Sequence, residues 1–158
     1  MSETATETRF RETQRFRQPW LWGLLLGVTL LVGGSLYVEG ASGLGAVIGL
    51  AVVVAVLALF AVAELTVEVR EDGVRIQFFP LHLSPWRIPL EDIECSEVVE
   101  YSPIRDYGGW GIRWTAGGKA YNVSGSEGVR VDRRDDRQLL IGSQRADELE
   151  AAIERARR

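Results

Sequence analysis

Two long, uncharged apolar runs constrain this chain more than any other feature of its sequence. They cover residues 20–38 and 44–63 and are separated by the short segment EGASG. A helix rises about 1.5 Å per residue, so each run can cross the roughly 30 Å hydrocarbon core of a bilayer. The break between them is too short for anything but a tight turn. The sequence therefore predicts a two-helix transmembrane hairpin over residues 19–63.

The hairpin is interpreted as an anchor, because neither run contains a charged residue or a histidine and a pore or transporter usually needs one. Small residues at helical spacing predict the faces on which the two helices pack, since they let helices approach closely in lipid. These residues are Gly23 and Gly27 in the first run and Ala41, Gly45 and Gly49 around the second. We expect this contact within the hairpin; a contact between two copies, giving a homo-oligomer, stays open.

Residues 1–18 are expected to form a disordered, basic stub beside the membrane. Arginines dominate residues 9–17, whereas the break between the runs carries no basic residue. The positive-inside rule therefore places both termini in the cytoplasm and the turn outside the plasma membrane. Arg15, Arg17, Trp20 and Trp22 are the expected anchors at the membrane interface, where arginines can also meet anionic head groups.

From residue 64 onward the apolar pattern changes from helical to alternating. LTVEV, REDG and VRIQF together predict a β-hairpin, and similar short strands at regular spacing continue to about residue 141. The apolar residues of 144–156 fall on one helical face. The predicted fold is thus a membrane α-hairpin followed by a mainly β domain over residues 64–158. This domain is expected to be an antiparallel half-barrel or sandwich of about seven strands, closed by the C-terminal helix.

Composition excludes several classes of function. The net charge of −4 argues against nucleic-acid binding. A single cysteine, Cys95, and a single histidine, His82, provide neither a disulfide nor a zinc site. No nucleophile with a base, cofactor motif or phosphate-binding glycine loop is recognisable, so no enzyme and no cofactor are expected. The strong preference for arginine over lysine, with the acidic surplus, suggests a GC-rich or salt-adapted prokaryotic source.

The segment around residues 102–110 is richest in residues of the type that bind partners. Arg105, Tyr107 and Trp110 combine an arginine and two aromatic rings with a flexible diglycine, and such residues dominate interface hot spots. The alternative is that the glycines only make a turn and that Trp110 caps the core.

Several stretches resemble uncharacterised prokaryotic proteins in which a pleckstrin-homology-like (PH-like) domain follows two transmembrane helices. The stretches are LTVEVREDGVRIQFFP, WRIPLEDIECSEV, YGGWGIRW, KAYNVSG and LLIGSQRADELEAAIERA. The resemblance implies a PH-like half-barrel closed by a helix, a fold that serves many binding tasks. Phosphoinositide-binding members use a basic first hairpin. Here Arg70 and Arg75 lie among Glu68, Glu71 and Asp72, so that ligand is not expected.

The expected function is that of a non-enzymatic binding or scaffolding module, held at the cytoplasmic face of the membrane. Its partner would be a protein or a lipid head group that meets the loops of the β-domain. The alternative is an accessory subunit of a larger membrane assembly, packed through its transmembrane hairpin.

Overall fold

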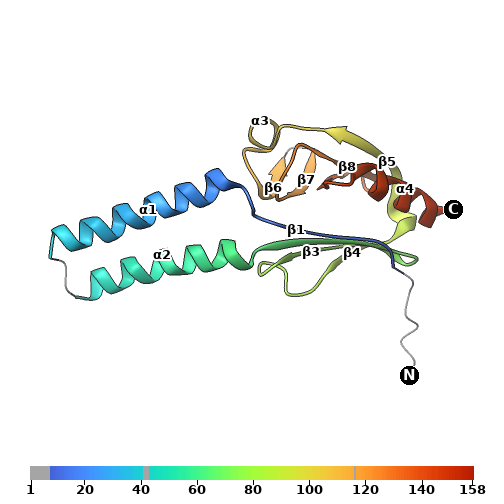
Figure 1. Cartoon of the computed structure of the whole chain (residues 1–158). Coiled ribbons are helices and arrows are strands. Elements are labelled where there is room, and N and C mark those ends of the chain that lie inside the picture. Colours follow the sequence, from blue (N-terminus) through green and yellow to red (C-terminus); the bar gives the residue numbers. More distant parts are fainter. Residues whose placement is uncertain (1–7, 41–42, 116) are drawn as a thin grey trace, which may run out of the picture. The chain divides into compact units, whose positions relative to one another are not determined.

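The computed structural model describes residues 8–40, 43–115 and 117–158. The chain divides into two compact units, each described here by itself (Figure 1). Residues 16–63 form a helical unit. Residues 8–15 and 64–158 form a β-rich unit, so the first described strand belongs to the same unit as the C-terminal part of the chain.

The helical unit contains α1 (Pro19–Val38) and α2 (Leu44–Val62), which confirms helices over both apolar runs. Pro19 occupies the first turn of α1, where its missing N–H removes no intrahelical hydrogen bond. Both helices are long and apolar enough to cross a membrane. Across the described length of both helices no side chain is buried, although the residues are apolar on all sides. An all-round apolar helix needs a nonaqueous surrounding, which a bilayer would supply.

The predicted packing glycines have no close neighbour in the hairpin, and their role in helix packing stays a prediction. A Cβ atom built at Gly23, Gly27, Gly45 or Gly49 would have nothing within 4 Å. An apolar groove of about 400 Å³ runs along α1 and α2, and branched side chains such as Leu25, Val28, Val53 and Val56 line it. Gly49 lines the same groove. Ala41 falls outside the described residues.

Within the described residues, the first sheet of the β-rich unit has antiparallel strands in chain order. The strands are β1 (Thr8–Arg15), β2 (Glu64–Arg70), β3 (Gly73–Phe79) and β4 (Trp86–Ile88). The predicted hairpin is confirmed, with Leu65, Val67 and Val69 buried on one face of β2. Gly73 has a φ of 148°, and a Cβ there would clash with the carbonyl of Ile88, so this turn requires glycine.

The second sheet has the strand order β5-β8-β9-β7-β6. Its strands are β5 (Ile93–Glu100), β6 (Gly111–Thr115), β7 (Gly118–Asn122), β8 (Glu127–Arg133) and β9 (Gln138–Gly142). The prediction of a wholly antiparallel domain is wrong at one position, because β7 and β9 are parallel. The strand β9 lies between β8 and β7 rather than at the sheet edge. Side chains alternate between the two faces of a sheet in parallel and antiparallel strand pairs alike, so the sequence pattern does not encode strand direction.

Short helices complete the β-rich unit. They are η1 (Leu90–Asp92), α3 (Pro103–Tyr107) and the C-terminal α4 (Ala146–Arg157). The predicted C-terminal helix is confirmed, and its face of Leu149, Ala152 and Ile153 is fully buried. This face packs on β1, β2, β5 and β8, so α4 contacts strands of both sheets.

Residues 1–18 were expected to form a disordered stub, but the described residues 8–15 form a strand. Residues 8–15 form β1, which pairs with β2 in register from Arg15 opposite Glu64. Three arginines of β1 form ion pairs with glutamates along β2 and its turn: Arg9 with Glu71, Arg11 with Glu68 and Arg15 with Glu64, at 2.9–3.4 Å. Positive charges expected to face lipid head groups are thus paired across the sheet. Residues 1–7 fall outside the described part of the chain.

The opposite face of β1 is buried and carries polar side chains that bind the second sheet. The amide of Gln14 donates a hydrogen bond to the carbonyl of Gly142 at 2.8 Å, and Gln14 is only 3% exposed. The carboxylate of Glu12 accepts hydrogen bonds from the Ser143 hydroxyl and, at 2.9 Å, from the Gln144 backbone N–H. We call this set of contacts the β1 clasp, because it links the first sheet to the end of β9.

Gln14→Ala is expected to lower the free energy of unfolding by about 1–3 kcal/mol, since the buried Gly142 carbonyl would lose its partner. The measurement is chemical unfolding of the full chain in detergent, followed by near-ultraviolet circular dichroism. Thr13→Ser, at an exposed neighbouring position, is the matched control. Equal stability of the Gln14→Ala variant and wild type would show that the Gln14–Gly142 hydrogen bond of the clasp contributes nothing.

Candidate functional site

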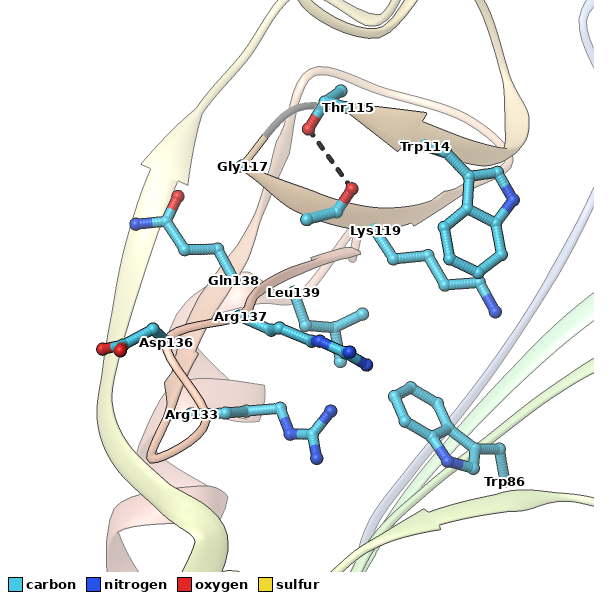
Figure 2. A pocket seen from close by; sticks show the side chains of 11 residues that line it. Trp86, Trp114, Thr115, Gly117, Lys119, Arg133, Asp136, Arg137, Gln138 and Leu139 are labelled. Carbon is cyan, nitrogen blue, oxygen red and sulfur yellow. Dashed lines mark hydrogen bonds between the residues drawn. The ribbon is translucent and has the colours of Figure 1, made fainter.

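A pocket of about 430 Å³ lies where the two sheets of the β-rich unit meet (Figure 2). Trp86 comes from β4 of the first sheet, and the other lining residues come from β6, β7, β8, β9 and their turns. We call it the Trp86 pocket. Its lining residues are Trp86, Trp114, Thr115, Gly117, Gly118, Lys119, Arg133, Asp136, Arg137, Gln138 and Leu139.

Lys119, the only lysine of the chain, reaches into this pocket from β7. Its ammonium lies 4.5 Å from the ring centre of Trp114, 4.7 Å from Tyr121 and 5.5 Å from Trp86. A cation over an aromatic face is attracted by the ring quadrupole, more strongly when water is partly excluded. Burial lowers the pKa of Lys119. No carboxylate among the described residues forms an ion pair with it, so the rings are its nearest stabilising groups.

Two arginines add further positive charge. The guanidinium of Arg133 lies 5.6 Å from the Trp86 ring centre, so this ring has both a lysine and an arginine nearby. Asp135 partly balances the arginines, at 3.3 Å from Arg133 and 3.9 Å from Arg137. The Nε of Arg133 is buried and has no hydrogen-bond partner among the described residues. In Figure 2 the charged ends of both arginines are directed toward the side of Trp86, whereas the Asp136 carboxylate points away.

Tyr121 and His82 lie beneath these charges. The Tyr121 ring is fully buried. Its centre lies 6.2 Å from the centre of the Trp86 ring and 5.8 Å from that of the His82 ring, which it meets edge to face. Burial raises the pKa of Tyr121 to about 12, and its hydroxyl has no partner among the described residues. Burial, and then the nearby charge of Lys119, lower the pKa of His82. The neutral form of the His82 imidazole is therefore favoured.

The charges and rings of this pocket are chemically suited to binding an anion. Lys119, Arg133 and Arg137 present three positive charges beside two indole rings, with Asp135 and Asp136 as the acidic neighbours. Cationic nitrogens that lack a full set of acceptors can donate charge-assisted hydrogen bonds to a carboxylate or phosphate. The indoles offer flat apolar surface for the rest of such a ligand. No group of histidine, cysteine and acidic residues in the described part of the chain could hold a metal ion.

Sequence reasoning missed this pocket because its members come from separate strands and a turn. Trp86 lies in β4 and Trp114 in β6, whereas Asp135 lies in the turn after β8 and pairs with Arg133. The one signal available was Lys119 itself, a single lysine in a chain whose other basic residues are all arginine.

The predicted partner loop lies elsewhere and is more ordered than expected. Arg105 and Tyr107 belong to the short helix α3, which Ser102 caps by accepting a hydrogen bond from the Arg105 N–H. Arg105 is exposed, and Tyr107 packs edge to face on Tyr101 with ring centres 5.7 Å apart. Trp110 is half-buried. None of the three predicted residues lines the Trp86 pocket, and their role in partner binding stays a prediction.

The four expected interface anchors can also be placed. Arg15 lies in β1, paired with Glu64, and Arg17 is exposed just before α1. Trp20 and Trp22 lie in the first turn of α1 and are 52% and 36% exposed. The indole N–H of Trp22 donates to the carbonyl of Phe16 at 2.9 Å. Their contact with lipid stays a prediction.

Alkaline titration gives a test of the buried Tyr121 beside Trp86 and Lys119. The pKa of Tyr121 is raised to about 12, so its neutral form contributes stability that is fully present below the ordinary value near 10. That contribution is lost as the pH rises from 10 through 12. Tyr121→Phe should remove one late-ionising phenol from the absorbance titration at 295 nm and leave neutral-pH stability unchanged. Loss of a phenol that ionises near pH 10, rather than of a late-ionising one, would contradict the assigned burial.

Comparison of the chain with models of known protein families and with curated protein sequences finds no match.

Proposed function

We propose that this protein is a non-enzymatic, membrane-anchored binding module. Its β-rich unit would receive, in the Trp86 pocket, a ligand that combines an anionic group with a flat apolar body. The observation that carries this proposal is the convergence of Lys119, Arg133 and Arg137 on the two indole rings. The pocket volume of about 430 Å³ is in the range of small-molecule sites.

The electrostatics of Lys119 favour an anion over a neutral or cationic ligand. Its ammonium has lost water and has gained rings but no carboxylate, and its pKa is lowered accordingly. A phosphate or carboxylate bound between Lys119 and Arg133 would supply an acceptor to Lys119 and a second acidic partner to Arg133, besides Asp135. Hydrogen bonds between ionised groups are roughly twice as strong as neutral ones, particularly where water is excluded.

The anchoring part of the proposal rests on α1 and α2 and on the strands that flank them. The pairing of β1 with β2 supports a two-span topology, because it requires Arg15 and Glu64 to lie on the same side of the bilayer. The basic residues before α1 favour the cytoplasmic side, although three of them are ion-paired. The two sheets and C-terminal helix support a PH-like relationship in element type. The strand before the helices and the parallel β7–β9 pair depart from the expected half-barrel.

Binding can be tested with phenyl phosphate, which has the proposed charge and flat body, against phenol as its uncharged match. The full chain in phosphatidylcholine nanodiscs is titrated while the indole N–H signals of Trp86 and Trp114 are followed by NMR. Phenyl phosphate should shift both signals, and Lys119→Met should weaken its binding about tenfold or more, the loss expected for one charge-assisted hydrogen bond. Arg105→Gln, outside the pocket, is the matched control and should bind as wild type.

Equal affinity for phenol, or unchanged binding in Lys119→Met and Arg133→Gln, would overturn the anionic site. The same titration in nanodiscs with anionic lipid separates two sources of the ligand. Competition by the lipid would identify a head group, whereas unchanged affinity would identify a soluble ligand.

The alternative is an accessory subunit that packs through its helices into a larger membrane assembly. One observation favours it: the glycine positions of both helices are open, with nothing within 4 Å of a built Cβ. They therefore remain available to another helix.

Replacing Gly45 and Gly49 with leucine tests this alternative, because the larger side chains would block close approach of a partner helix. The size of the complex extracted in mild detergent should then decrease. Val47→Leu, on another exposed part of α2, is the control. No change in complex size would eliminate the glycine face as an assembly surface.

A further inference from the structure

The connection between β3 and β4 exposes apolar side chains that the β-rich unit does not cover. Leu81 is 62% exposed and Leu83 is 80% exposed, and Phe79 at the end of β3 is 38% exposed. The stretch FFPLHLSPW, residues 78–86, contains no arginine, lysine, aspartate or glutamate. We call residues 79–83 the apolar loop. A cluster of exposed apolar side chains in water is unfavourable unless something covers it.

The apolar loop is held in one conformation by hydrogen bonds. The backbone N–H of His82 donates to the Phe78 carbonyl at 2.7 Å. The side-chain amide of Gln77 donates to the carbonyls of His82 and Leu83 at 3.2 and 3.1 Å. His82 turns inward and packs against Tyr121, so the residues on either side of it are directed outward. The exposure of Leu81 and Leu83 is thus a consequence of ordered backbone geometry.

The register of the first sheet places this loop beside both connections to the helical unit. Arg15 is paired with Glu64, and Glu64 is paired with Phe79. Glu64 follows Ala63 directly, and Ala63 follows the last residue of α2. Residues paired across an antiparallel sheet lie about 5 Å apart. If α2 crosses the bilayer, Glu64 emerges at its surface, and Phe79 lies one strand away from that point.

We propose that the apolar loop inserts Phe79, Leu81 and Leu83 into the interfacial layer of the same membrane leaflet from which α2 emerges. The occupant is lipid, because chain connectivity alone brings this end of the sheet to the bilayer surface. The loop is uncharged, so insertion buries no unpaired ionic group. Insertion of the loop would attach the β-rich unit to the membrane at a third point, besides its two covalent connections to the helices. This inference rests on the membrane anchoring proposed above.

Site-specific fluorescence in reconstituted vesicles tests the proposal. A Cys95→Ala background removes the exposed native thiol, and single cysteines at Leu81 or Leu83 are labelled with an environment-sensitive nitrobenzoxadiazole probe. The vesicles are phosphatidylcholine, with or without lipid carrying a nitroxide near the head group. Both probes should be quenched strongly by the nitroxide lipid and several-fold less by aqueous iodide than a probe at Glu71. Glu71 is the matched control, since its turn lies at the opposite end of the first sheet.

A further probe at Val54, in the middle of α2, separates the two hypotheses. Quenching of Val54 by nitroxide deep in the acyl chains, with Leu81 and Leu83 open to iodide, would overturn loop insertion while retaining the anchor. Absence of deep quenching at Val54 would overturn the anchor itself. Loop probes shielded from iodide yet insensitive to nitroxide lipid would also overturn insertion and would identify a protein contact in its place.

Discussion

The pairing of β1 with β2 is the interaction on which the rest of the β-rich unit depends. It joins two segments separated by the whole helical hairpin, and it brings the chain ends on either side of that hairpin into one sheet. The outer face of β1 is held by ion pairs to β2, and its inner face by the β1 clasp to β9. An exposed ion pair contributes little alone, whereas the buried clasp would leave unsatisfied polar groups if it opened. The clasp therefore fixes how the two sheets meet.

The Trp86 pocket follows from that arrangement of the sheets. Trp86 belongs to the first sheet, and Lys119 and Tyr121 belong to the second, so the contacts of the Trp86 ring with Lys119 and Tyr121 exist only when both sheets are assembled. Partial burial strengthens the attraction of Lys119 to the rings, but it also removes part of the water that would hydrate the ammonium. An anion in the pocket would resolve this conflict. The proposed binding of an anion thus depends on the partly buried ammonium of Lys119, which the fold places beside the rings.

The same sheet register underlies the proposed attachment of the β-rich unit to the membrane. Arg15, Glu64 and Phe79 lie in a row at one end of the first sheet, and two of these residues adjoin the helical unit in sequence. The exposed leucines of the apolar loop follow Phe79 directly. Apolar residues that would be a liability on a freely soluble domain are thereby placed where a lipid surface can cover them.

The sequence by itself determined the two apolar helices, the β2–β3 hairpin and the C-terminal helix, because each depends on periodicity within one short segment. Only the tertiary structure decided the remainder. The sequence predicts a basic stub for residues 8–15, because their arginines find their glutamate partners only when β1 pairs with the distant β2. The parallel placement of β9 and the open glycine faces were likewise not encoded locally. The pocket required Trp86, Lys119 and Arg133 to converge from separate strands, and such convergence is a property of packing between distant segments.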